Sequence, residues 1–419
     1  MRILILSQWY MPEPALLLQE LAQTLLARGH EVTVLTGFPN YPSGKLYPGY
    51  HLRLFRRETL NGVPVARVPL YCNHSHSGVL RVINYVSFAL SAAALGPWVV
   101  EKPDIIFVYH PPLTIGIPAF VLSRLWRIPF VYQIQDMWPE TLSATDMVSK
   151  AWVLETVGAF ARWVYARAAA ICVISPGFRQ NLIDKSVPSA RIYLTPNWID
   201  PEAYPIVEPD PELARELGLA DHFNVMFAGN LGEAQGLDKV LEAARLCQDT
   251  PQVQFVFVGS GVAESRLKEI ARQQELTNVL FLGRYPVERM PALYALADVL
   301  LIHLKDDPLF RITIPSKTYA YLASGKPILA AVAGDAARIV TEAGAGVTCP
   351  PDNPAQLAAT VRLLYSLSQE QLQEMGQRGR LAAETIYSRE EVVTQIEDAL
   401  TIVVQQHQTR HAPQQTKSA

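Results

Sequence analysis

The residues best suited to hold a charged ligand lie around the triplet Pro315-Ser316-Lys317, in the second half of the chain. Proline and serine mark the start of a helix, and the later Gly325-Lys326-Pro327 marks its end. The N–H groups at a helix start can bind an anion, and the lysine ammonium adds a positive charge. We therefore predict that Ser316, Lys317 and Thr318 bind a diphosphate, and that Lys317 acts catalytically by stabilising it as a leaving group.

Three glycine-containing loops follow predicted strands in the same half. The loop 229–237 contains three glycines and opens a helix, which lets backbone N–H groups approach an anion, although ordinary β–α turns share this pattern. A glycine-serine turn and a strand end with an arginine follow. The arginine either contacts a phosphate or a base, or is simply solvated. The residues of these loops that we predict to bind the ligand are Gly229, Asn230, Gly232, Gln235, Gly236, Gly259, Ser260, Arg284 and Tyr285.

The first half of the chain offers two carboxylates and an aromatic ring directly after a predicted strand. Asp136 and Glu140 flank Trp138, which either stacks on a sugar ring or is an ordinary buried side chain. Either carboxylate could take a proton from an attacking hydroxyl, so both are predicted to be catalytic, with helix capping as the alternative for Asp136. His110 ends another predicted strand and is expected on the same side, unless it is a loop histidine without a catalytic role.

The sequence gives no sign of a metal site or of a disulfide. No Asp-X-Asp motif occurs at a predicted strand end, and Asp306-Asp307 has no histidine or cysteine nearby. The four cysteines are far apart and form no Cys-X-X-Cys pair, so we expect separate reduced thiols. No cofactor is expected, and the helix start and the lysine would replace a metal ion.

The elements that must position these residues alternate between short β-branched runs and amphipathic helical stretches, a pattern typical of parallel sheets. Such sheets bind ligands beyond the carboxyl ends of their strands, so two facing α/β domains would hold a ligand in the cleft between them. Strands are predicted at 2–6, 31–35, 63–68, 104–109, 129–134 and 170–174, and then at 224–228, 253–258, 279–282, 299–302, 327–331 and 346–349.

The expected domain boundaries follow from a proline-rich stretch in the middle of the chain. Residues 1–195 would form an N-terminal acceptor-side domain, 196–210 an ordered linker, and 211–388 a C-terminal domain that binds the ligand. A final helix is predicted over 389–405, packing back on the N-terminal domain. The polar remainder, 406–419, is predicted to be disordered.

The charge balance and the N-terminus indicate where the protein works. A formal net charge of −3 argues against a general nucleic-acid binder. No signal peptide fits the N-terminus, so a cytoplasmic location is expected. The stretch 82–100 has no charged residue; a helix buried in the domain, a helix lying in a membrane interface, and a membrane span are the alternatives.

In their order and spacing these motifs resemble the family 4 retaining glycosyltransferases of the GT-B fold, in particular a bacterial surface-polysaccharide branch typified by fucosamine and colanic-acid transferases. The resemblance implies two facing Rossmann-like domains, a nucleoside-diphosphate sugar as donor, retention of the anomeric configuration, and a polyprenyl-linked acceptor at the cytoplasmic membrane. It also places Asn40 and Tyr41 on the acceptor side, with His110 and Trp138. Further motifs that carry it are 10–14, 28–36, 38–45, 135–140 and 196–200.

The sequence departs from the family pattern at three places. Two glutamates of the family, seven residues apart, are replaced by Ile312 and Ala320, and loss of the second, a ribose acceptor, would weaken donor binding by about 1–3 kcal/mol. An arginine and a lysine of the first C-terminal loop are replaced by Asn230 and Gln235. The first N-terminal loop has Ala15-Leu16-Leu17 in place of paired glycines.

Two other functions stay open, and one is disfavoured. A nucleotide-sugar epimerase or hydrolase of the same architecture would act on its nucleotide sugar without an acceptor. A weakened sugar-nucleotide-binding protein is the alternative prompted by Ala320. An NAD-dependent dehydrogenase is disfavoured, because the first strand leads into Ser7-Gln8-Trp9-Tyr10 and no Gly-X-Gly-X-X-Gly follows it.

Overall fold

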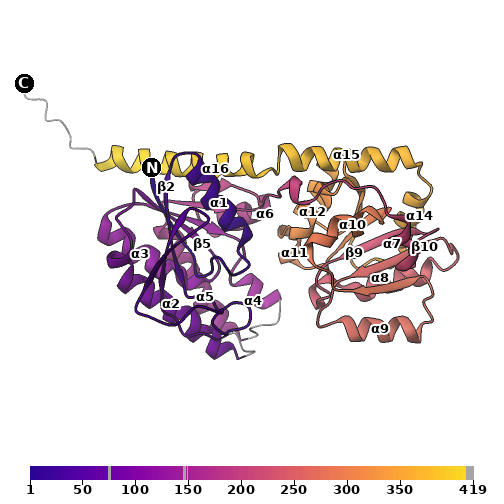
Figure 1. Ribbon diagram of the computed structural model, residues 1–419, viewed down its shortest axis with the longest axis horizontal. Coiled ribbons are helices and arrows are strands. Elements are labelled where there is room, and N and C mark those ends of the chain that lie inside the picture. Colours follow the sequence, from indigo (N-terminus) through magenta and orange to yellow (C-terminus); the bar gives the residue numbers. More distant parts are fainter. Residues whose placement is uncertain (74–76, 145–147, 149, 412–419) are drawn as a thin grey trace, which may run out of the picture. The chain divides into compact units, whose positions relative to one another are not determined.

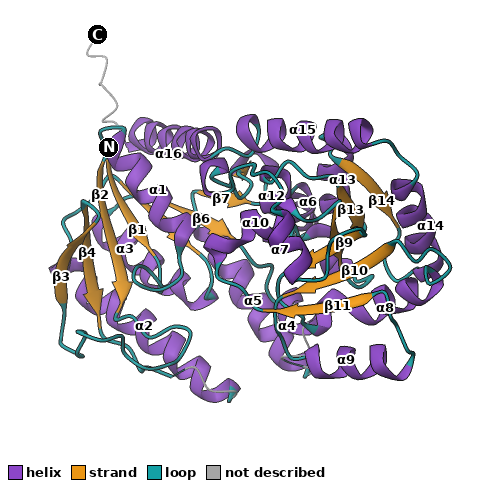
Figure 2. Ribbon diagram, turned by 45° about the vertical axis from the view of Figure 1, so that its right-hand side comes forward, coloured by secondary structure: helices purple, strands orange, loops and turns teal. Residues whose placement is uncertain are grey.

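The computed structural model describes residues 1–73, 77–144, 148 and 150–411. The chain forms two compact units (Figure 1): Met1–Pro196 together with the C-terminal segment from Val392, and Asn197–Glu391. Both are α/β units, and each has its own largely parallel sheet (Figure 2).

The first unit contains an eight-stranded sheet in the order β3-β4-β2-β1-β5-β6-β7-β8. All neighbouring strands pair in parallel except β3 and β4, which are antiparallel. The strands are β1 (Arg2–Leu6), β2 (Glu31–Gly37), β3 (Arg56–Leu60), β4 (Val63–Val68), β5 (Ile105–Tyr109), β6 (Phe130–Ile134), β7 (Ala170–Val173) and β8 (Ile192–Leu194). The central strands are buried on both faces, as expected where helices cover both sides of a sheet.

The helices of this unit connect consecutive strands. They are α1 (Leu16–Ala27), α2 (Gly78–Val99), α3 (Gly116–Trp126), α4 (Glu140–Ala144), α5 (Ala151–Arg167) and α6 (Pro176–Asp184). Helix α2 covers the apolar stretch 82–100. Its Phe88, Ala89 and Ala92 are buried in the unit, so the helix packs on the domain along one side.

The last helix, α16 (Arg389–His411), belongs to the first unit from Val392 onward. Its Glu397 accepts hydrogen bonds from the side chains of Arg28 and His30, both at 2.7 Å. The helix runs six residues beyond the predicted end, so the prediction of disorder is wrong for 406–411. A contact of 3.0 Å between the His407 ring and the Arg127 carbonyl oxygen helps to hold this extension. The rest of the predicted tail, 412–419, lies outside the described residues.

The second unit contains a six-stranded parallel sheet in the order β11-β10-β9-β12-β13-β14. Successive residues point to opposite faces of each strand: Phe227, Phe257 and Leu301 enter one hydrophobic cluster, and Met226 and Val256 enter the other. The strands are β9 (Phe223–Ala228), β10 (Val253–Val258), β11 (Val279–Gly283), β12 (Val299–His303), β13 (Ile328–Ala331) and β14 (Gly346–Cys349).

Helices cover both faces of this second sheet. They are α7 (Pro211–Glu216), α8 (Leu237–Leu246), α9 (Glu264–Gln273), α10 (Met290–Ala295), α11 (Pro308–Ile312), α12 (Ser316–Ala323), α13 (Asp335–Glu342), α14 (Pro354–Tyr365) and α15 (Gln369–Thr385).

The proline-rich stretch before β9 is ordered and belongs to the second unit. Arg380 of α15 donates hydrogen bonds to the carbonyl oxygens of Pro201 and Tyr204, at 3.1 and 2.7 Å. The ring of Tyr204 stacks on Tyr294 with centroids 6.3 Å apart. These contacts fix the stretch along the surface of the unit that it enters.

Candidate functional site

The carboxyl ends of β9, β10 and β11 are joined by hydrogen bonds that glycine N–H groups donate. The N–H of Gly229 donates to the carbonyl oxygen of Val258 at 2.8 Å. The N–H of Gly259 donates to the carbonyl oxygen of Gly283 at 2.7 Å. Gly229 and Gly259 have φ of 144° and 136°, and a Cβ on Gly259 would lie 1.9 Å from the Gly229 oxygen. Only glycine fits at position 259, because the backbones of the two loops cross there.

Lys317 of α12 reaches the same glycine loop. Its Nζ lies 3.4 Å from the centroid of the Phe227 ring and 3.3 Å from Oε1 of Gln235. The helix is fixed to β9 by Tyr321, whose hydroxyl accepts the Ala228 N–H at 2.8 Å and donates to the Ala228 oxygen at 3.0 Å. The structure thus brings together Lys317 and Gln235, which were predicted as ligand-binding residues from segments 82 positions apart.

Near pH 7, Lys317 is present in both its charged and its neutral form. Burial lowers the pKa of its ammonium from its ordinary value to about 7. The π-face of Phe227 and the amide oxygen of Gln235 both favour the protonated form. A diphosphate beside Nζ would favour that form far more strongly, so an anion that binds here would bind together with a proton at alkaline pH.

The start of α12 presents backbone donors next to Lys317. Pro315 occupies the N-cap position, and no side chain of the described residues caps the helix there. Ser316 is exposed, whereas Thr318 is fully buried and its N–H is bonded to the Pro315 oxygen at 2.9 Å. Of the three predicted residues, Ser316 is therefore at the surface, Lys317 is half-buried, and Thr318 is buried.

The other predicted residues of this half occupy the same edge of the sheet. Leu231 donates its N–H to the Ser260 oxygen at 2.9 Å, which ties the two loops together. Asn230 and Ser260 are exposed. Arg284 is exposed and Tyr285 is half-buried, immediately after the end of β11. The remaining loop residues, Gly232 and Gly236, flank the turn 233–235.

His303 belongs to this site and was missed. It is buried at the end of β12, and its Nδ1 lies 2.6 Å from the Gln235 carbonyl oxygen. Burial lowers the pKa of the imidazole, so the ring is neutral near pH 7 and Nδ1 donates to the carbonyl. It holds the turn from which Gln235 reaches Lys317. The expectation that functional residues lie at strand ends would have predicted His303, because it is the last residue of β12.

The two replaced family glutamates fall on α11 and α12. Ala320 is buried in the second turn of α12, and Ile312 is half-buried at the end of α11. Neither side chain can accept a hydrogen bond, so a ribose contact on this part of α12 would have to come from a backbone group or from another residue.

In the first unit, His110 is the residue most clearly prepared for a ligand. It is 1% exposed, its ring centroid lies 5.8 Å from those of Tyr132 and Trp138, and neither ring nitrogen has a hydrogen-bond partner among the described residues. Burial lowers its pKa to about 3, so the imidazole is neutral. A buried polar group without a partner is uncommon and points to a missing ligand or water.

The two predicted carboxylates of this unit differ in their surroundings. Oε1 of Glu140 forms an ion pair with Lys185 and accepts a hydrogen bond from Asn181 at 3.3 Å. This side chain therefore ties α4 to the end of α6. Burial raises the pKa of Asp136, which forms no ion pair within the described part of the chain. Of the two, Asp136 is the better placed to exchange a proton.

Glu13 organises the acceptor-side loops and was missed as a functional residue. Its buried carboxylate accepts the N–H groups of Tyr10 at 3.2 Å, and of Asn40 and Tyr41 at 2.8 Å each. Burial raises its pKa to about 7. Asn40 is itself buried and donates to the Phe38 oxygen at 2.9 Å, so it is a structural residue of the loop. The sequence signal that could have identified Glu13 is its position between Pro12 and Pro14.

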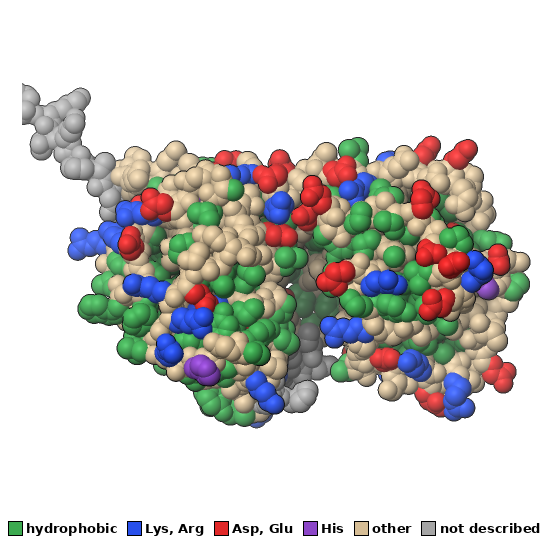
Figure 3. All heavy atoms as spheres, in the orientation of Figure 1, with side chains coloured by type: hydrophobic (Ala, Val, Ile, Leu, Met, Phe, Trp, Pro, Cys, Tyr) green, Lys and Arg blue, Asp and Glu red, His purple; other side chains and the backbone are tan. Residues whose placement is uncertain are grey.

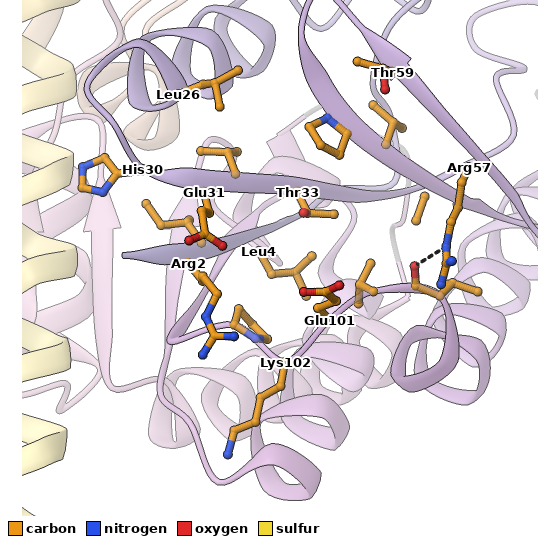
Figure 4. Close-up of a pocket in the computed structure, with 18 of the residues that line it drawn as sticks. Arg2, Leu4, Leu26, His30, Glu31, Thr33, Arg57, Thr59, Glu101 and Lys102 are labelled. Carbon is orange, nitrogen blue, oxygen red and sulfur yellow. Dashed lines mark hydrogen bonds between the residues drawn. The ribbon is translucent and has the colours of Figure 1, made fainter.

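Cavities in both units lie away from these residues. One of 690 Å³ in the first unit is lined by Arg2, Glu31 and Lys102, at the amino ends of the strands (Figure 4). One of 440 Å³ in the second unit is lined by Asn224 and Asp298, again at amino ends. Both therefore lie at the end of the sheet opposite to the glycine loops and His110.

Among the described residues, no group of three or more His, Cys, Asp or Glu side chains is arranged to hold a metal ion. The four cysteines are separate thiols, as predicted.

Comparison with known proteins finds matches to both units of the chain. A family model of the glycosyl transferase 4-like domain matches residues 15–198, and one of the glycosyl transferases group 1 matches 210–382. The chain is 30% identical over 316 residues to the colanic acid biosynthesis glycosyl transferase WcaI of Escherichia coli (strain K12), covering 73% of this chain and 76% of that protein. It is 25% identical over 280 residues to the glycosyltransferase WbjE of Pseudomonas aeruginosa, covering 66% and 68%.

The crystal structure of Anabaena HepE in complex with UDP matches 96% of this chain and 100% of that chain, with a TM-score of 0.70 and 19% identity. The predicted GT-B fold is thereby confirmed. The chain belongs to the group 1 glycosyltransferases and carries the glycosyl transferase 4-like N-terminal domain of that type.

Proposed function

We propose that the protein transfers a sugar from a nucleoside-diphosphate donor to a lipid-linked saccharide, with retention of anomeric configuration, in surface-polysaccharide biosynthesis. The observation that carries the proposal is the position of Lys317 Nζ against the glycine loop, beside Gln235 and the open start of α12. The names of WcaI and WbjE support the reaction class, and the UDP in HepE supports the class of donor.

The donor diphosphate binds to the N–H group of Ser316 and to the ammonium of Lys317, beside the glycine loop. A charged hydrogen bond contributes about 1.5–3 kcal/mol and a helix start about 0.3–1 kcal/mol, without any metal ion. Ser260, Arg284 and Tyr285, at the neighbouring strand ends, are the groups offered to the nucleoside. Because the charge on the diphosphate grows as it leaves, these contacts stabilise the transition state more than the bound donor.

The transfer breaks the bond between the anomeric carbon and the diphosphate oxygen and forms one to the acceptor oxygen on the same face of the sugar. The proton of the acceptor hydroxyl passes to Asp136, whose raised pKa suits it to hold a proton during the step. The unpartnered nitrogens of His110 and the ring of Trp138 are the first unit's contacts to a sugar.

The test is a panel of nucleotide sugars, with thermal stability measured for the wild type and for Lys317→Ala. A donor that stabilises the wild type and not the variant identifies both ligand and site. That donor is then incubated with and without lipid-linked saccharides from bacterial membranes. Transfer only with an acceptor supports the proposal. Conversion of the donor alone would show an epimerase or a hydrolase, and tight binding without turnover on any acceptor would show a binding protein.

A further inference from the structure

The outward face of α2 has the wrong polarity for a helix in contact with water. Val79, Ile83, Leu90 and Trp98 are exposed and recur four to eight residues apart, so they form one apolar stripe along the helix. Leu90 is 59% exposed and Trp98 81%. A surface helix normally turns polar side chains outward.

On the inner face of the same helix lies a buried polar residue, Asn84. Asn84 is buried, accepts a hydrogen bond of 2.6 Å from Gln8 Nε2 and donates one of 2.6 Å to the Tyr71 oxygen. In the described part of the chain, α2 is the helix that is long and apolar enough to cross a membrane by length and composition. Asn84 and Phe88 are buried in the unit and fix the inner face of the helix there. Only the outer apolar stripe can therefore contact a membrane.

A second exposed apolar segment adjoins the end of α2. Leu52, Leu54 and Phe55 are exposed before β3. Arg57 follows them and donates hydrogen bonds to the carbonyl oxygens of Trp98 at 3.1 Å and of Val99 at 3.0 Å. Its guanidinium lies 5.8 Å from the centroid of the Phe55 ring. We call this combined surface the α2 face: Leu52, Leu54, Phe55, Val79, Val82, Ile83, Leu90 and Trp98, with Arg53 and Arg57 among them.

Charge favours an anionic partner for this face. The first unit, residues 1–196 and 392–419, contains 19 Lys and Arg against 13 Asp and Glu, whereas the second unit, 197–391, contains 17 against 26, so the first unit is basic within an acidic chain. Helix α2 itself contains Arg81 and no acidic residue. Figure 3 shows Lys and Arg side chains interspersed with apolar ones over the part of the first unit where Figure 1 places α2.

We propose that the α2 face docks the first unit on the surface of an anionic lipid bilayer. The stripe from Val79 to Trp98 enters the boundary between headgroups and acyl chains, and the arginines bind lipid phosphates. The inference deepens the proposed function, because a lipid-linked acceptor lies at such a surface. A second copy of the chain would bury the same stripe but would gain nothing from the net positive charge of this unit.

The experiment measures flotation of the full chain with phosphatidylcholine vesicles, with and without one part in four of phosphatidylglycerol. We expect binding to the anionic vesicles, its loss in molar salt, and at least about a tenfold weaker partition for Leu90→Gln/Trp98→Gln. Val262→Gln is the matched control, since Val262 is 84% exposed on the second unit. Arg53→Gln should weaken binding to anionic vesicles and leave the circular dichroism spectrum unchanged.

Three results would overturn the proposal: no wild-type binding to anionic vesicles, equal partition of the wild type and Leu90→Gln/Trp98→Gln, or a wild-type dimer that this variant dissociates. The last would assign the face to a second copy of the chain. Stabilisation by UDP, measured on the same samples, must be equal in wild type and variants. A change in vesicle binding with unchanged UDP binding tests only the role of the α2 face. Absence of UDP binding with unchanged vesicle binding counts only against the proposed function.

Discussion

Lys317→Met removes the positive charge from the glycine loop and keeps the length and the apolar stem of the side chain. A charged hydrogen bond of about 1.5–3 kcal/mol corresponds to a loss of UDP affinity of about 10- to 150-fold. This full loss is expected near pH 6.5, where Lys317, with a pKa of about 7, is mostly protonated before UDP binds. Isothermal titration calorimetry measures the dissociation constant directly.

The same lysine gives the wild type a characteristic pH dependence. A bound diphosphate raises the pKa of Lys317 above its value of about 7 in the free protein, so above that pH binding must take up a proton. Between about pH 7.5 and pH 8.5, where the terminal phosphate of UDP is already ionised and its uracil is still neutral, affinity should fall by up to about tenfold per pH unit. The Lys317→Met variant lacks the group and should show a flat profile over this interval.

A matched control is Lys268→Met. Lys268 is on α9 of the same unit and pairs with Glu264 at 2.8 Å, away from the strand ends. It should bind UDP as the wild type does at every pH. The prediction is refuted if Lys317→Met stays within about twofold of the wild type at pH 6.5, or if wild-type affinity does not change between about pH 7.5 and pH 8.5.

Three further predictions concern the surroundings of the site. Gly259→Ala places a Cβ 1.9 Å from the Gly229 oxygen and should lower the free energy of unfolding in urea by about 3 kcal/mol or more; a loss below about 1 kcal/mol would contradict the crossing of the loops. Glu13, with its pKa raised by burial to about 7, stabilises the fold most when protonated, so stability should fall as pH rises from about 5 through 7. Glu13→Gln should reduce this dependence of the unfolding free energy on pH, measured by urea titration. An unchanged dependence in the variant would contradict the raised pKa of Glu13. Ala320→Glu should tighten UDP binding about tenfold if no other group holds the ribose, and an unchanged calorimetric affinity would show that another group does.

Most of the fold was predictable because buried parallel strands are continuous apolar runs. Strand β9 and its neighbours have no polar face to confuse the pattern, and both hydrophobic clusters draw on them. Strand β3 was missed, because its sequence Arg-Arg-Glu-Thr-Leu carries three charges and only pairing with β4 at the edge of the sheet makes it a strand. The extension of α16 past residue 405 was missed because a polar helix end depends on tertiary contacts such as that of His407.

The site was predictable where it depends on strand ends and helix starts. Lys317 and the glycine loop meet as expected, since both lie at the carboxyl edge of one sheet. Side-chain direction was not predictable. Thr318 turns inward on α12, and Glu140 pairs with Lys185, 45 residues away, which no local pattern reveals. Glu13 was overlooked for the same reason, because its partners Asn40 and Tyr41 come from a distant loop.

A crystal structure of the protein with UDP tests the central claim most directly. We predict diphosphate oxygens within hydrogen-bonding distance of Lys317 Nζ and of the N–H group of Ser316. A diphosphate bound at the amino ends of the strands, or bound with the Lys317 ammonium still directed at Phe227 and Gln235 alone, would contradict it.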